Sequence, residues 1–434
     1  MGISYNPSIV TEGLVLALDP QSTRSYVGSG TTWTDLTNRG NSGTLTNGPV
    51  FIPGGPFNNS GGSVYFDGTT DYLTVAETGS EFTFGTGDFT IEFWVYRNNT
   101  NQTVYFDWRN VGGNQGARPI IYSYNSQLRY YTGGADRITA TDLSANTWHH
   151  IALCRSGTST KMFVNGTQVG STYSDSSTYL SPQGSEGIYI GAFAGGSYDL
   201  DGYISNFRII KGTALYTADF TPPTGPLEAI DDTVLLTCQG GAITDNGPNS
   251  HAITVNNDAK AITASAFEFD GSNDYAVTSS NTDFLFGTEE FTIEWWEYFT
   301  DGTGYAGHIG VFEFGGGDDT AHIWTVSGSF HGYVGSWTSI AMQPISNQWA
   351  HYVVTGTSGN IKFYQNSELK DTKNWDWSAT SSTANFAVGG TPGWSFGNYA
   401  MAGKISDVKV YKGKSFTEDE VKRNFSALRG RYGI

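Results

Sequence analysis

Cysteine is almost absent from this chain, which has only two cysteines in 434 residues. Cys154 and Cys238 occupy unlike positions, one inside an apolar run and one just past the middle of the chain. Disulfide scaffolds and thiolate metal clusters need several cysteines at regular spacing, so both kinds of protein are excluded. We expect Cys154 and Cys238 to be buried, small apolar side chains.

Basic residues are also scarce, with 23 Lys and Arg against 41 Asp and Glu, which gives a formal net charge of −18. A protein that binds nucleic acid or an anionic membrane presents a basic face to its partner. The composition therefore argues against both partners and leaves neutral or cationic ones.

Long apolar runs are missing as well. No run approaches the length of a membrane-spanning helix. The first 13 residues, MGISYNPSIVTEG, have neither the charged leader nor the apolar core of a signal peptide. We expect a protein that is made and assembled in a cytoplasm.

Helical periodicity is nearly absent before the C-terminus. A capping box, a hydrophobic staple and an i, i+4, i+7 repeat occur there, formed by Phe416, Thr417, Glu420, Val421, Phe425 and Leu428. This pattern predicts one short helix over residues 417–428. Arg429 and Arg431 follow it and suit a helix C-terminus. They make either a basic docking tail or an ordinary solvated surface.

The chain does contain a long internal repeat. Residues 63–75 (SVYFDGTTDYLTV) match residues 266–278 (AFEFDGSNDYAVT). Further matches follow in register: 89–95 (FTIEFWV) with 291–297 (FTIEWWE), 148–151 with 349–352, and 202–212 (GYISNFRIIKG) with 403–413 (GKISDVKVYKG). The offset falls only from 203 residues at the first match (63 to 266) to 201 at the last (202 to 403). A period near 200 residues indicates a duplicated domain.

Both copies have the pattern of β-strands. In residues 89–95, Phe89, Ile91 and Phe93 alternate with more polar residues, which is the period of a strand with one apolar face. Aromatic residues make up 15% of the chain and glycine 56 residues, as is typical of short strands joined by tight turns. We predict an all-β fold of two tandem antiparallel sandwiches with a short C-terminal helix.

The repeat sets the expected domain bounds. The segments GLVLALD (13–19) and VLLTC (234–238) look like the first strands of their copies. Three prolines among residues 222–226 predict a stiff connector with a fixed arrangement of the domains. We expect an N-terminal arm that orders on a neighbour (1–12), a first domain (13–221), a Pro-rich linker (222–232), a second domain (233–416), and a C-terminal helix with a basic tail (417–434).

The first copy contains a fixed succession of segments: GLVLALD, SGTTWTDL, FDGTTDYLTV, FTIEFWVY, a Trp-His strand, FVNG and GYISNFRIIKG. This succession resembles that of the laminin-G-like members of the concanavalin A-like jelly rolls. The resemblance covers nearly the whole chain and implies two-sheet sandwiches of about 200 residues each. The connector DFTPPTGPL and the ending NFSALRGRYGI look more narrowly like tandem modules of virion structural proteins of tailed phages, notably those that infect cyanobacteria.

Some relatives of this fold are retaining glucanases, which place two glutamates and an aspartate on one strand. The nearest approach here is Glu268 and Asp270, and neither Ser272 nor Asn273 supplies the third carboxylate. In the first copy Tyr65 stands where Glu268 does. His150 and His351 coincide between the copies without a matching nucleophile, so we predict structural roles for them. We therefore expect no enzyme activity.

Calcium is the most plausible ion, because jelly rolls of this kind often hold one on loop oxygens and calcium prefers oxygen ligands. The candidate ligands are Asp67, Asp71, Asp270 and Asp274. Each of these pairs is also ordinary turn chemistry, and no cofactor is required by the pattern.

Tryptophans are the candidate contact residues of the second copy. They are candidates for a glycan platform or for a subunit interface, since aromatic residues concentrate in both: Trp324, Trp337, Trp375, Trp377 and Trp394. Interface burial is the preferred interpretation, which makes a homo-oligomer a candidate assembly.

The predicted function is that of a non-enzymatic virion structural protein of a tailed phage, either a capsid decoration or an appendage protein. It would dock on other virion proteins and adhere to a host surface glycan. The alternative is a carbohydrate-binding module or glycoside hydrolase of the concanavalin A-like class.

Overall fold

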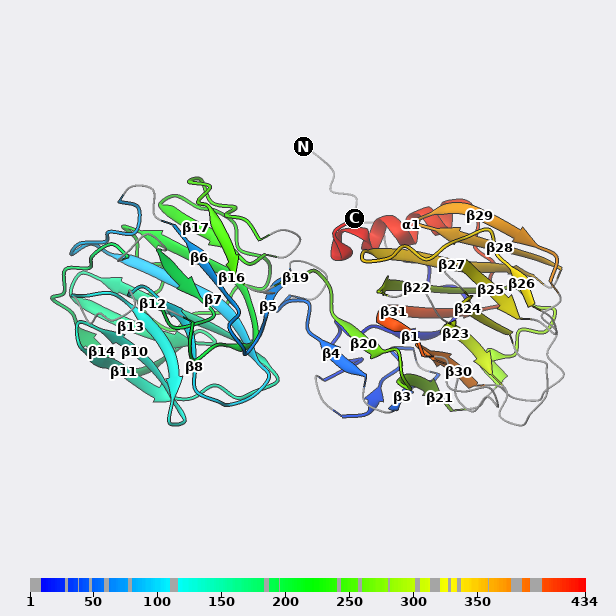
Figure 1. The fold of residues 1–434 in the computed structure, drawn as a ribbon, viewed down its shortest axis with the longest axis horizontal. Coiled ribbons are helices and arrows are strands. Elements are labelled where there is room, and N and C mark those ends of the chain that lie inside the picture. The colour runs from blue at the N-terminus through cyan, green and yellow to red at the C-terminus, as the bar shows by residue number, and fades with distance from the viewer. Residues whose placement is uncertain are drawn as a thin grey trace. The chain divides into compact units, whose positions relative to one another are not determined.

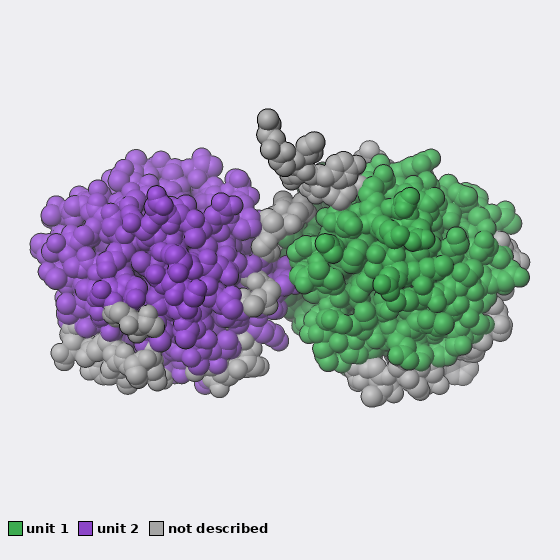
Figure 2. Space-filling view, turned by 90° about the horizontal axis from the view of Figure 1, so that it is seen from above, with its two compact units in different colours: residues 1–53, 264–434 green, residues 54–263 purple. Residues whose placement is uncertain are grey.

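The computed structural model describes residues 9–434 apart from short gaps. The gaps are residues 28–29, 38, 47–48, 58–61, 77–79, 110–115, 183–186, 195, 240–242, 257–259, 280–281, 301–304, 313–320, 327–328, 334–336, 358, 376–384 and 391–399. The chain forms two compact units (Figures 1 and 2). Unit 1 consists of residues 1–53 and 264–434, and unit 2 consists of residues 54–263. In the described parts, no helix is long and apolar enough to cross a membrane.

Unit 2 is built from two antiparallel sheets. The β7 sheet has the order β14 (Thr167–Ser174), β13 (Ser159–Val164), β12 (Trp148–Ser156), β7 (Phe89–Arg97), β16 (Asp201–Lys211), β5 (Ser63–Asp67) and β19 (Lys260–Ile262), and β17 (Thr233–Thr237) also pairs with β16. The β8 sheet has the order β11 (Ala135–Thr141), β10 (Gln127–Thr132), β9 (Ile120–Tyr124), β8 (Thr103–Asp107), β15 (Ile188–Ile190), β6 (Tyr72–Val75) and β18 (Ile253–Asn256).

Unit 1 repeats this architecture. The β22 sheet has the order β29 (Glu368–Lys373), β28 (Asn360–Gln365), β27 (Trp349–Thr357), β22 (Phe291–Phe299), β31 (Ala402–Lys412), β20 (Ala266–Asp270) and β4 (Val50–Ile52), and β1 (Leu14–Leu18) also pairs with β31. The β23 sheet has the order β2 (Thr32–Trp33), β3 (Gly43–Thr46), β21 (Tyr275–Thr278), β30 (Asn385–Val388), β23 (Tyr305–Phe312), β24 (Ala321–Val326), β25 (Ser329–Tyr333) and β26 (Trp337–Ser339). A 3-10 turn, η1 (Thr282–Phe284), follows β21.

The core of each unit lies between its two sheets, as the alternating pattern predicts. In β7, Phe89, Ile91, Phe93 and Val95 are fully buried and face the opposite sheet. The two free cysteines are also buried, which confirms the expectation for them. Burial raises the pKa of each thiol to about 12, so neither is a reactive thiolate at neutral pH. The all-β fold with one short C-terminal helix is confirmed.

The division of the chain corrects the predicted domain bounds of 13–221 and 233–416. The first strand of the chain, β1, pairs with β31 of the second copy, and β17 pairs with β16 of the first copy. The strand that precedes the first copy therefore completes the core of the second copy, and the strand that precedes the second copy completes the core of the first. Unit 2 is one continuous stretch, and it is inserted between β4 and β20 of unit 1.

The Pro-rich segment is not a linker between the units, which corrects the predicted connector at 222–232. Residues 214–220 pack on the outer face of the β7 sheet, where the Tyr216 and Phe220 rings stack at 3.6 Å. The backbone N–H of Leu227 donates to Asn206 Oδ1 at 2.8 Å within the same unit. The chain passes between the units at residues 53–54 and 263–264 instead.

The predicted C-terminal helix is confirmed as α1 (Glu418–Leu428), followed by the 3-10 turn η2 (Arg429–Tyr432). Thr417 caps α1, and its capping box with Glu420 is complete. The prediction of a basic docking tail is wrong for Arg431, which is buried and pairs with Asp19 at 3.0 Å. Of the two arginines, only Arg429 is exposed. In the predicted arm, Val10 is buried in unit 1 and its N–H donates to Asn424 Oδ1 at 2.9 Å, while residues 1–8 lie outside the described part.

Candidate functional site

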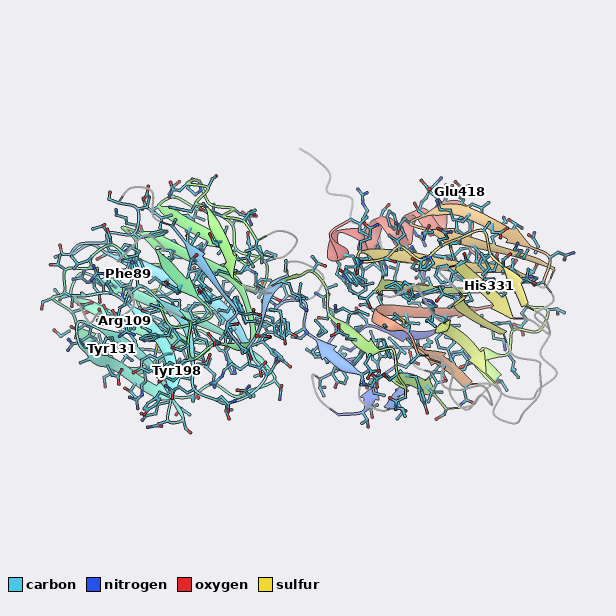
Figure 3. The ribbon with its side chains drawn as sticks, in the orientation of Figure 1. Phe89, Arg109, Tyr131, Tyr198, His331 and Glu418 are labelled. Carbon is cyan, nitrogen blue, oxygen red and sulfur yellow. The ribbon has the colours of Figure 1, made fainter. Side chains whose placement is uncertain are left out.

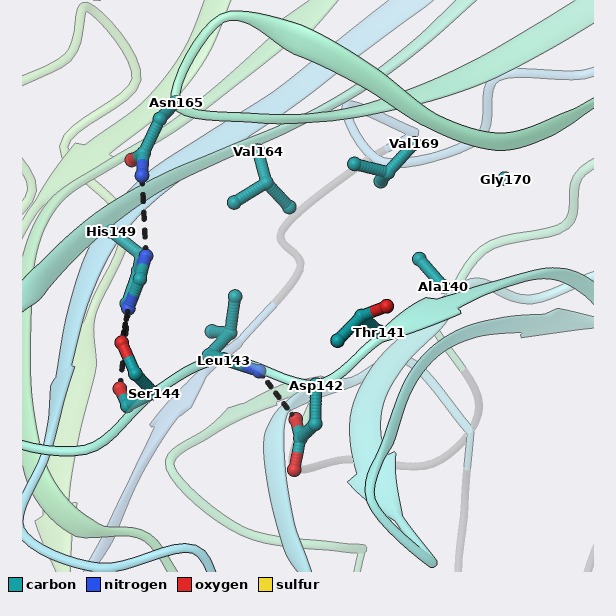
Figure 4. Close-up of a pocket in the computed structure, with 10 residues that line it drawn as sticks. All are labelled: Ala140, Thr141, Asp142, Leu143, Ser144, His149, Val164, Asn165, Val169 and Gly170. Atoms are coloured by element: carbon teal, nitrogen blue, oxygen red, sulfur yellow. Dashed lines mark hydrogen bonds between the residues drawn. The ribbon is translucent and has the colours of Figure 1, made fainter.

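A pocket of about 560 Å³ opens at one edge of unit 2 (Figure 4). We name it the edge pocket. Its walls come from the end of β11, the loop that follows, the start of β12 and the β13–β14 hairpin, and they consist of Ala140, Thr141, Asp142, Leu143, Ser144, His149, Val164, Asn165, Val169 and Gly170. Leu143, Val164 and Val169 supply apolar surface, and the remaining side chains are mostly polar.

The hairpin between β13 and β14 holds one wall in place. Asn165 and Gly166 form a tight turn, with φ of 51° and 80°. A Cβ at position 166 would lie 1.9 Å from the carbonyl oxygen of Phe220, so the turn requires glycine. Asn165 Oδ1 accepts the backbone N–H of His150 at 2.9 Å, which fixes the orientation of the Asn165 amide.

The orientation of the Asn165 amide also fixes the tautomer of the His149 ring. The amide nitrogen of Asn165 lies 3.2 Å from His149 Nδ1, so Nδ1 accepts and the proton sits on Nε2. His149 Nε2 lies 3.2 Å from the carbonyl oxygen of Ser144 and 3.0 Å from its hydroxyl. Burial lowers the pKa of His149 below its ordinary value, which favours the neutral ring.

Ser144, His149 and Asn165 resemble a catalytic triad in composition, but the hydrogen bonds run the wrong way. A general base needs a free Nε2 that accepts the serine proton while Nδ1 donates to its partner. Here Nδ1 accepts from Asn165 and Nε2 carries the proton. This arrangement holds the ring in position and does not activate Ser144.

A buried polar network supports the pocket from behind. Arg97 is almost fully buried, and its Nη1 lies 2.9 Å from Asp142 Oδ2 and 3.2 Å from Ser123 Oγ. The Tyr105 hydroxyl lies 2.7 Å from the same Ser123 oxygen. Because Arg97 neutralises Asp142, the pocket presents hydrogen-bonding groups without a net charge of its own.

Unit 1 lacks an equivalent of His149. Asn366 repeats the role of Asn165, since its Oδ1 accepts the N–H of His351 at 2.9 Å. Ala350 stands where His149 does in the repeat, with the same offset that relates His150 to His351. The edge pocket is therefore a feature of unit 2 that the duplicated framework does not itself require.

The predicted structural histidines lie in two buried ion clusters. His150 Nε2 is 3.1 Å from Glu92, which also pairs with Arg208 at 2.6 Å. The equivalent His351 Nε2 is 3.2 Å from Glu294, and the nearby cation there is Lys409 at 3.8 Å. These side chains are almost fully buried, so a structural role suits both histidines.

The residues closest to a glucanase motif do not form a catalytic pair. Glu268 is partly exposed and pairs with Lys404 at 3.3 Å. Asp270 Oδ1 accepts the N–H of Ser272 at 2.7 Å, as a turn residue does. Neither carboxylate lies on the inner face of its sheet.

The four candidate calcium ligands form two identical turns. Asp67 Oδ1 accepts the N–H of Thr69 at 2.7 Å, and Asp71 Oδ2 accepts the N–H of Asp67 at 3.1 Å. Asp270 and Asp274 repeat the pattern in unit 1. Among the described residues, no three His, Cys, Asp or Glu side chains gather as a metal site would require.

Chelation tests whether calcium occupies these turns. Because hydrogen bonds within the turns already use carboxylate oxygens of each pair, we expect EDTA to leave the melting temperature (Tm) of the protein unchanged. Thermal unfolding with EDTA and with added calcium chloride measures this. A fall in Tm with EDTA that calcium reverses would show that an ion holds the turns together.

Of the five candidate tryptophans, only Trp375 has a described side chain. It is half-buried, lies against Gly332, and contacts the Phe363 ring at 5.3 Å at the edge of the unit 1 core. Trp324 and Trp337 lie on β24 and β26, but their side chains, and the whole of Trp377 and Trp394, are outside the described part. Trp375 therefore closes a core and is not an open platform.

An aromatic patch on unit 2 was not foreseen from the sequence. The Arg109 guanidinium lies 4.9 Å from the Tyr131 ring and 4.9 Å from the Phe193 ring, and Asp107 holds it at 3.2 Å. Tyr198 is 51% exposed beside Phe193. Arg109, Tyr131 and Tyr198 come from separate parts of the chain and lie on unit 2 in Figure 3, so no local motif marks them.

Two antiparallel sheets that enclose one core in each unit place the protein in the class of β-sandwich jelly rolls. The family model described as the concanavalin A-like lectin/glucanases superfamily, Laminin_G_3, matches residues 66–215 and 270–422. The chain belongs to this family, and the predicted laminin-G resemblance is confirmed. No match is found among curated proteins.

Several solved structures are similar in fold. Domains LG4-5 of the mouse laminin α1 chain are 11% identical over 84% of this chain and 90% of theirs, with a TM-score of 0.29. The binding domain of botulinum neurotoxin DC, solved with rat synaptotagmin II, is 14% identical over 38% of this chain, with a TM-score of 0.31, and only 43% of that chain is covered. Domain 4 of the arabinanase AbnA of Geobacillus stearothermophilus, solved with arabinotriose, is 16% identical over 44% of this chain and 83% of that chain, with a TM-score of 0.30.

Proposed function

We propose that this protein is a non-enzymatic adhesion protein that binds a neutral glycan in the edge pocket of unit 2. The observation that carries the proposal is the composition of that pocket, whose wall combines the apolar Leu143, Val164 and Val169 with polar side chains. Sugar rings offer apolar C–H faces and several hydroxyls, so a site of this composition suits them.

The charge of the site favours a neutral ligand. Asp142 is the acidic group in the wall, and the buried Arg97 compensates it at 2.9 Å. An anionic ligand would meet a chain of net charge −18 and no free cation in the described pocket wall. Hydroxyl groups, in contrast, can both donate to Asp142 and accept from the Asn165 amide or the Thr141 hydroxyl.

We further propose that the protein works on the virion of a tailed phage, as a capsid decoration or an appendage protein. The support is the likeness of residues 219–227 and 424–434 to segments of such virion proteins. Both segments pack on the outer face of a sheet, Phe220 against His150 in unit 2 and Phe425 against Trp296 in unit 1. Both segments therefore cover part of a sheet's outer face in this protein.

Mass spectrometry of purified virions, with antibody labelling seen by electron microscopy, tests the virion role. Regular labelling over the head would identify a decoration protein, and labelling at the tail would identify a host-contact protein. Absence of the chain from purified particles would reject the virion role and leave the glycan-binding proposal to be judged by itself.

Replacement of His149 by alanine is expected to weaken glycan binding at least tenfold without unfolding unit 2. Ala350 occupies the equivalent position in unit 1, so the framework accepts alanine there. The ring forms one wall of the pocket and orders Ser144 and Asn165, whose bonds to it would be lost. Binding is measured on an array of neutral oligosaccharides and then by calorimetry with the best ligand.

The matched control is His331→Ala, which removes a partly buried histidine of unit 1 outside the pocket. This variant should bind as the unchanged protein does. Equal binding by the His149→Ala variant, with an unchanged Tm, would place the glycan site elsewhere. The aromatic patch around Arg109 would then be the next surface to test.

A further inference from the structure

Each unit is completed by a segment of strands that lies outside its own copy of the repeat. We name residues 14–52, with β1, β2, β3 and β4, the N-terminal donor, and residues 233–262, with β17, β18 and β19, the central donor. The N-terminal donor contributes to both sheets of unit 1, and the central donor contributes to both sheets of unit 2. Each donor therefore completes a sandwich that would otherwise lack strands in both layers.

The first strands of the two donors bind in the same register. In unit 1, Leu16 pairs with Val410 and Leu18 with Val408. In unit 2, Leu235 pairs with Ile209 and Thr237 with Phe207, which the repeat makes equivalent to Val410 and Val408. Both pairings also have an irregularity at the same place, between Leu14 and Leu16 and between Ile209 and Ile210.

Two further strand pairs repeat this agreement, β3 matching β18 and β4 matching β19. Thr44 pairs with Val277, and Thr254 pairs with the equivalent Thr74. Ile52 pairs with Ala266, and Ile262 pairs with the equivalent Ser63. The backbone hydrogen bonds of a core therefore do not distinguish one donor from the other.

Each donor also contains a buried or partly buried aspartate that accepts backbone N–H groups of the same donor, and the two aspartates bond at equivalent positions. Asp35 accepts the N–H groups of Ala17 at 3.0 Å and Thr37 at 2.9 Å. Asp245 accepts the N–H groups of Leu236 at 3.0 Å and Gly247 at 2.8 Å in the same relative positions. In each donor, these hydrogen bonds join residues of the donor itself.

Side chains do select the core for the N-terminal donor. Trp33 is fully buried in unit 1, with its ring 4.7 Å from Phe267. The equivalent of Phe267 in unit 2 is the smaller Val64. Arg431 of unit 1 pairs with Asp19 of the donor at 3.0 Å. The N-terminal donor therefore fits unit 1, although unit 2 follows it directly in the chain.

We infer that the N-terminal donor of one copy completes unit 1 of a second copy of this chain, so that copies link by exchange of strands. The donor is joined to unit 2 at residues 53–54, and unit 2 has a donor of its own. It can therefore leave its core without opening unit 2. The exchanged contacts are those seen within a single chain, so neither form gains contacts over the other.

Concentration then decides between the closed chain and the linked form. A tethered donor has an effective concentration on the order of millimolar when its connection is short and flexible. Linked copies become the major form when the concentration of the folding chain is comparable to this effective concentration. Because the donor is seated in both sheets, exchange requires unfolding of unit 1, so the linkage is set during folding.

Crosslinking of two full-length chains tests the inference. One chain carries Thr44→Cys and the other carries Val277→Cys, and both have alanine at positions 154 and 238. Thr44 is exposed, lies directly opposite Val277 and can form a disulfide with a cysteine there. The chains are mixed in denaturant, refolded together over a range of concentrations, oxidised and run on a non-reducing gel.

We expect a disulfide-linked dimer whose fraction rises with refolding concentration, with the bond mapped between positions 44 and 277. The matched control places Thr254→Cys and Thr74→Cys on separate chains and should give no dimer, because the central donor is continuous with unit 2. The inference is overturned if the 44/277 mixture stays monomeric at every concentration while a single chain with both cysteines closes on itself. A crosslink from position 44 to a cysteine at position 74 would overturn it as well, since the donor would then complete unit 2.

Discussion

Replacement of Glu92 by glutamine is expected to destabilise unit 2 by about 3–5 kcal/mol, because it leaves a buried arginine without its counter-charge. Glu92 is fully buried and accepts from Arg208 Nε at 3.0 Å and Nη2 at 2.6 Å. His150 Nε2 and the Tyr216 hydroxyl each lie 3.1 Å from its other oxygen. Urea denaturation followed by fluorescence measures the loss of the free energy of unfolding.

The same substitution should change how stability depends on pH. Burial alone would raise the pKa of Glu92, but the hydrogen bond to His150 and the charge of Arg208 outweigh burial and hold the pKa below its ordinary value. A carboxyl whose pKa is lower in the folded state stabilises above its unfolded pKa, about 4.3, and loses this contribution as the pH falls through the folded pKa. The Glu92→Gln variant should therefore lose less stability than the unchanged protein on acidification below about pH 4.3.

Glu268→Gln is the control, because Glu268 is a partly exposed carboxylate paired with Lys404. Its loss should cost no more than about 1 kcal/mol. If Glu92→Gln costs no more than this control, the buried cluster contributes little to stability and its burial must have another cause. If the acid dependence of the two proteins is the same, the pH dependence comes from other carboxyls.

The alternating pattern was enough to predict the strands, because burial of one face of a sheet is a local property of the sequence. The domain bounds were wrong for a physical reason. GLVLALD and VLLTC meet equivalent edges in the same register, so the sequence gives no sign of which copy each one completes. The choice depends on contacts such as that of Trp33 with Phe267, which are hundreds of residues apart in the chain.

The candidate site was harder to predict. The edge pocket combines Asp142, His149 and Asn165, which come from separate elements and form no motif. One signal was present in the repeat: His149 stands opposite Ala350 while its neighbours match. A difference between otherwise matching copies marks a residue that the shared fold does not need. Arg431 could not be placed from the sequence. Its charge suggested a solvent-exposed tail, and its ion pair with Asp19 is visible only in the folded structure.

Replacement of Trp296 by alanine is expected to destabilise unit 1 by about 3–5 kcal/mol and to release the C-terminal segment. The Trp296 ring is almost fully buried and stacks on Tyr432 at 4.0 Å and on Phe425 at 5.7 Å. Without it, α1 and η2 lose the surface on which they lie. Trypsin should then cleave after Arg431, which is buried in the unchanged protein, and mass spectrometry of the products detects this.

Trp94→Ala is the matched control, because Trp94 is the equivalent residue in unit 2. It is only half-buried and meets the Phe57 ring edge-on at 5.6 Å, so its loss removes less buried surface. This variant should unfold at a urea concentration closer to that of the unchanged protein and should leave Arg431 protected. Equal losses in the two variants, or continued protection of Arg431 in Trp296→Ala, would mean that the C-terminal segment is held by its polar contacts. Those contacts would be the ion pair of Arg431 with Asp19 and the bond from Asn424 to Glu294, and the stack of rings would then be secondary.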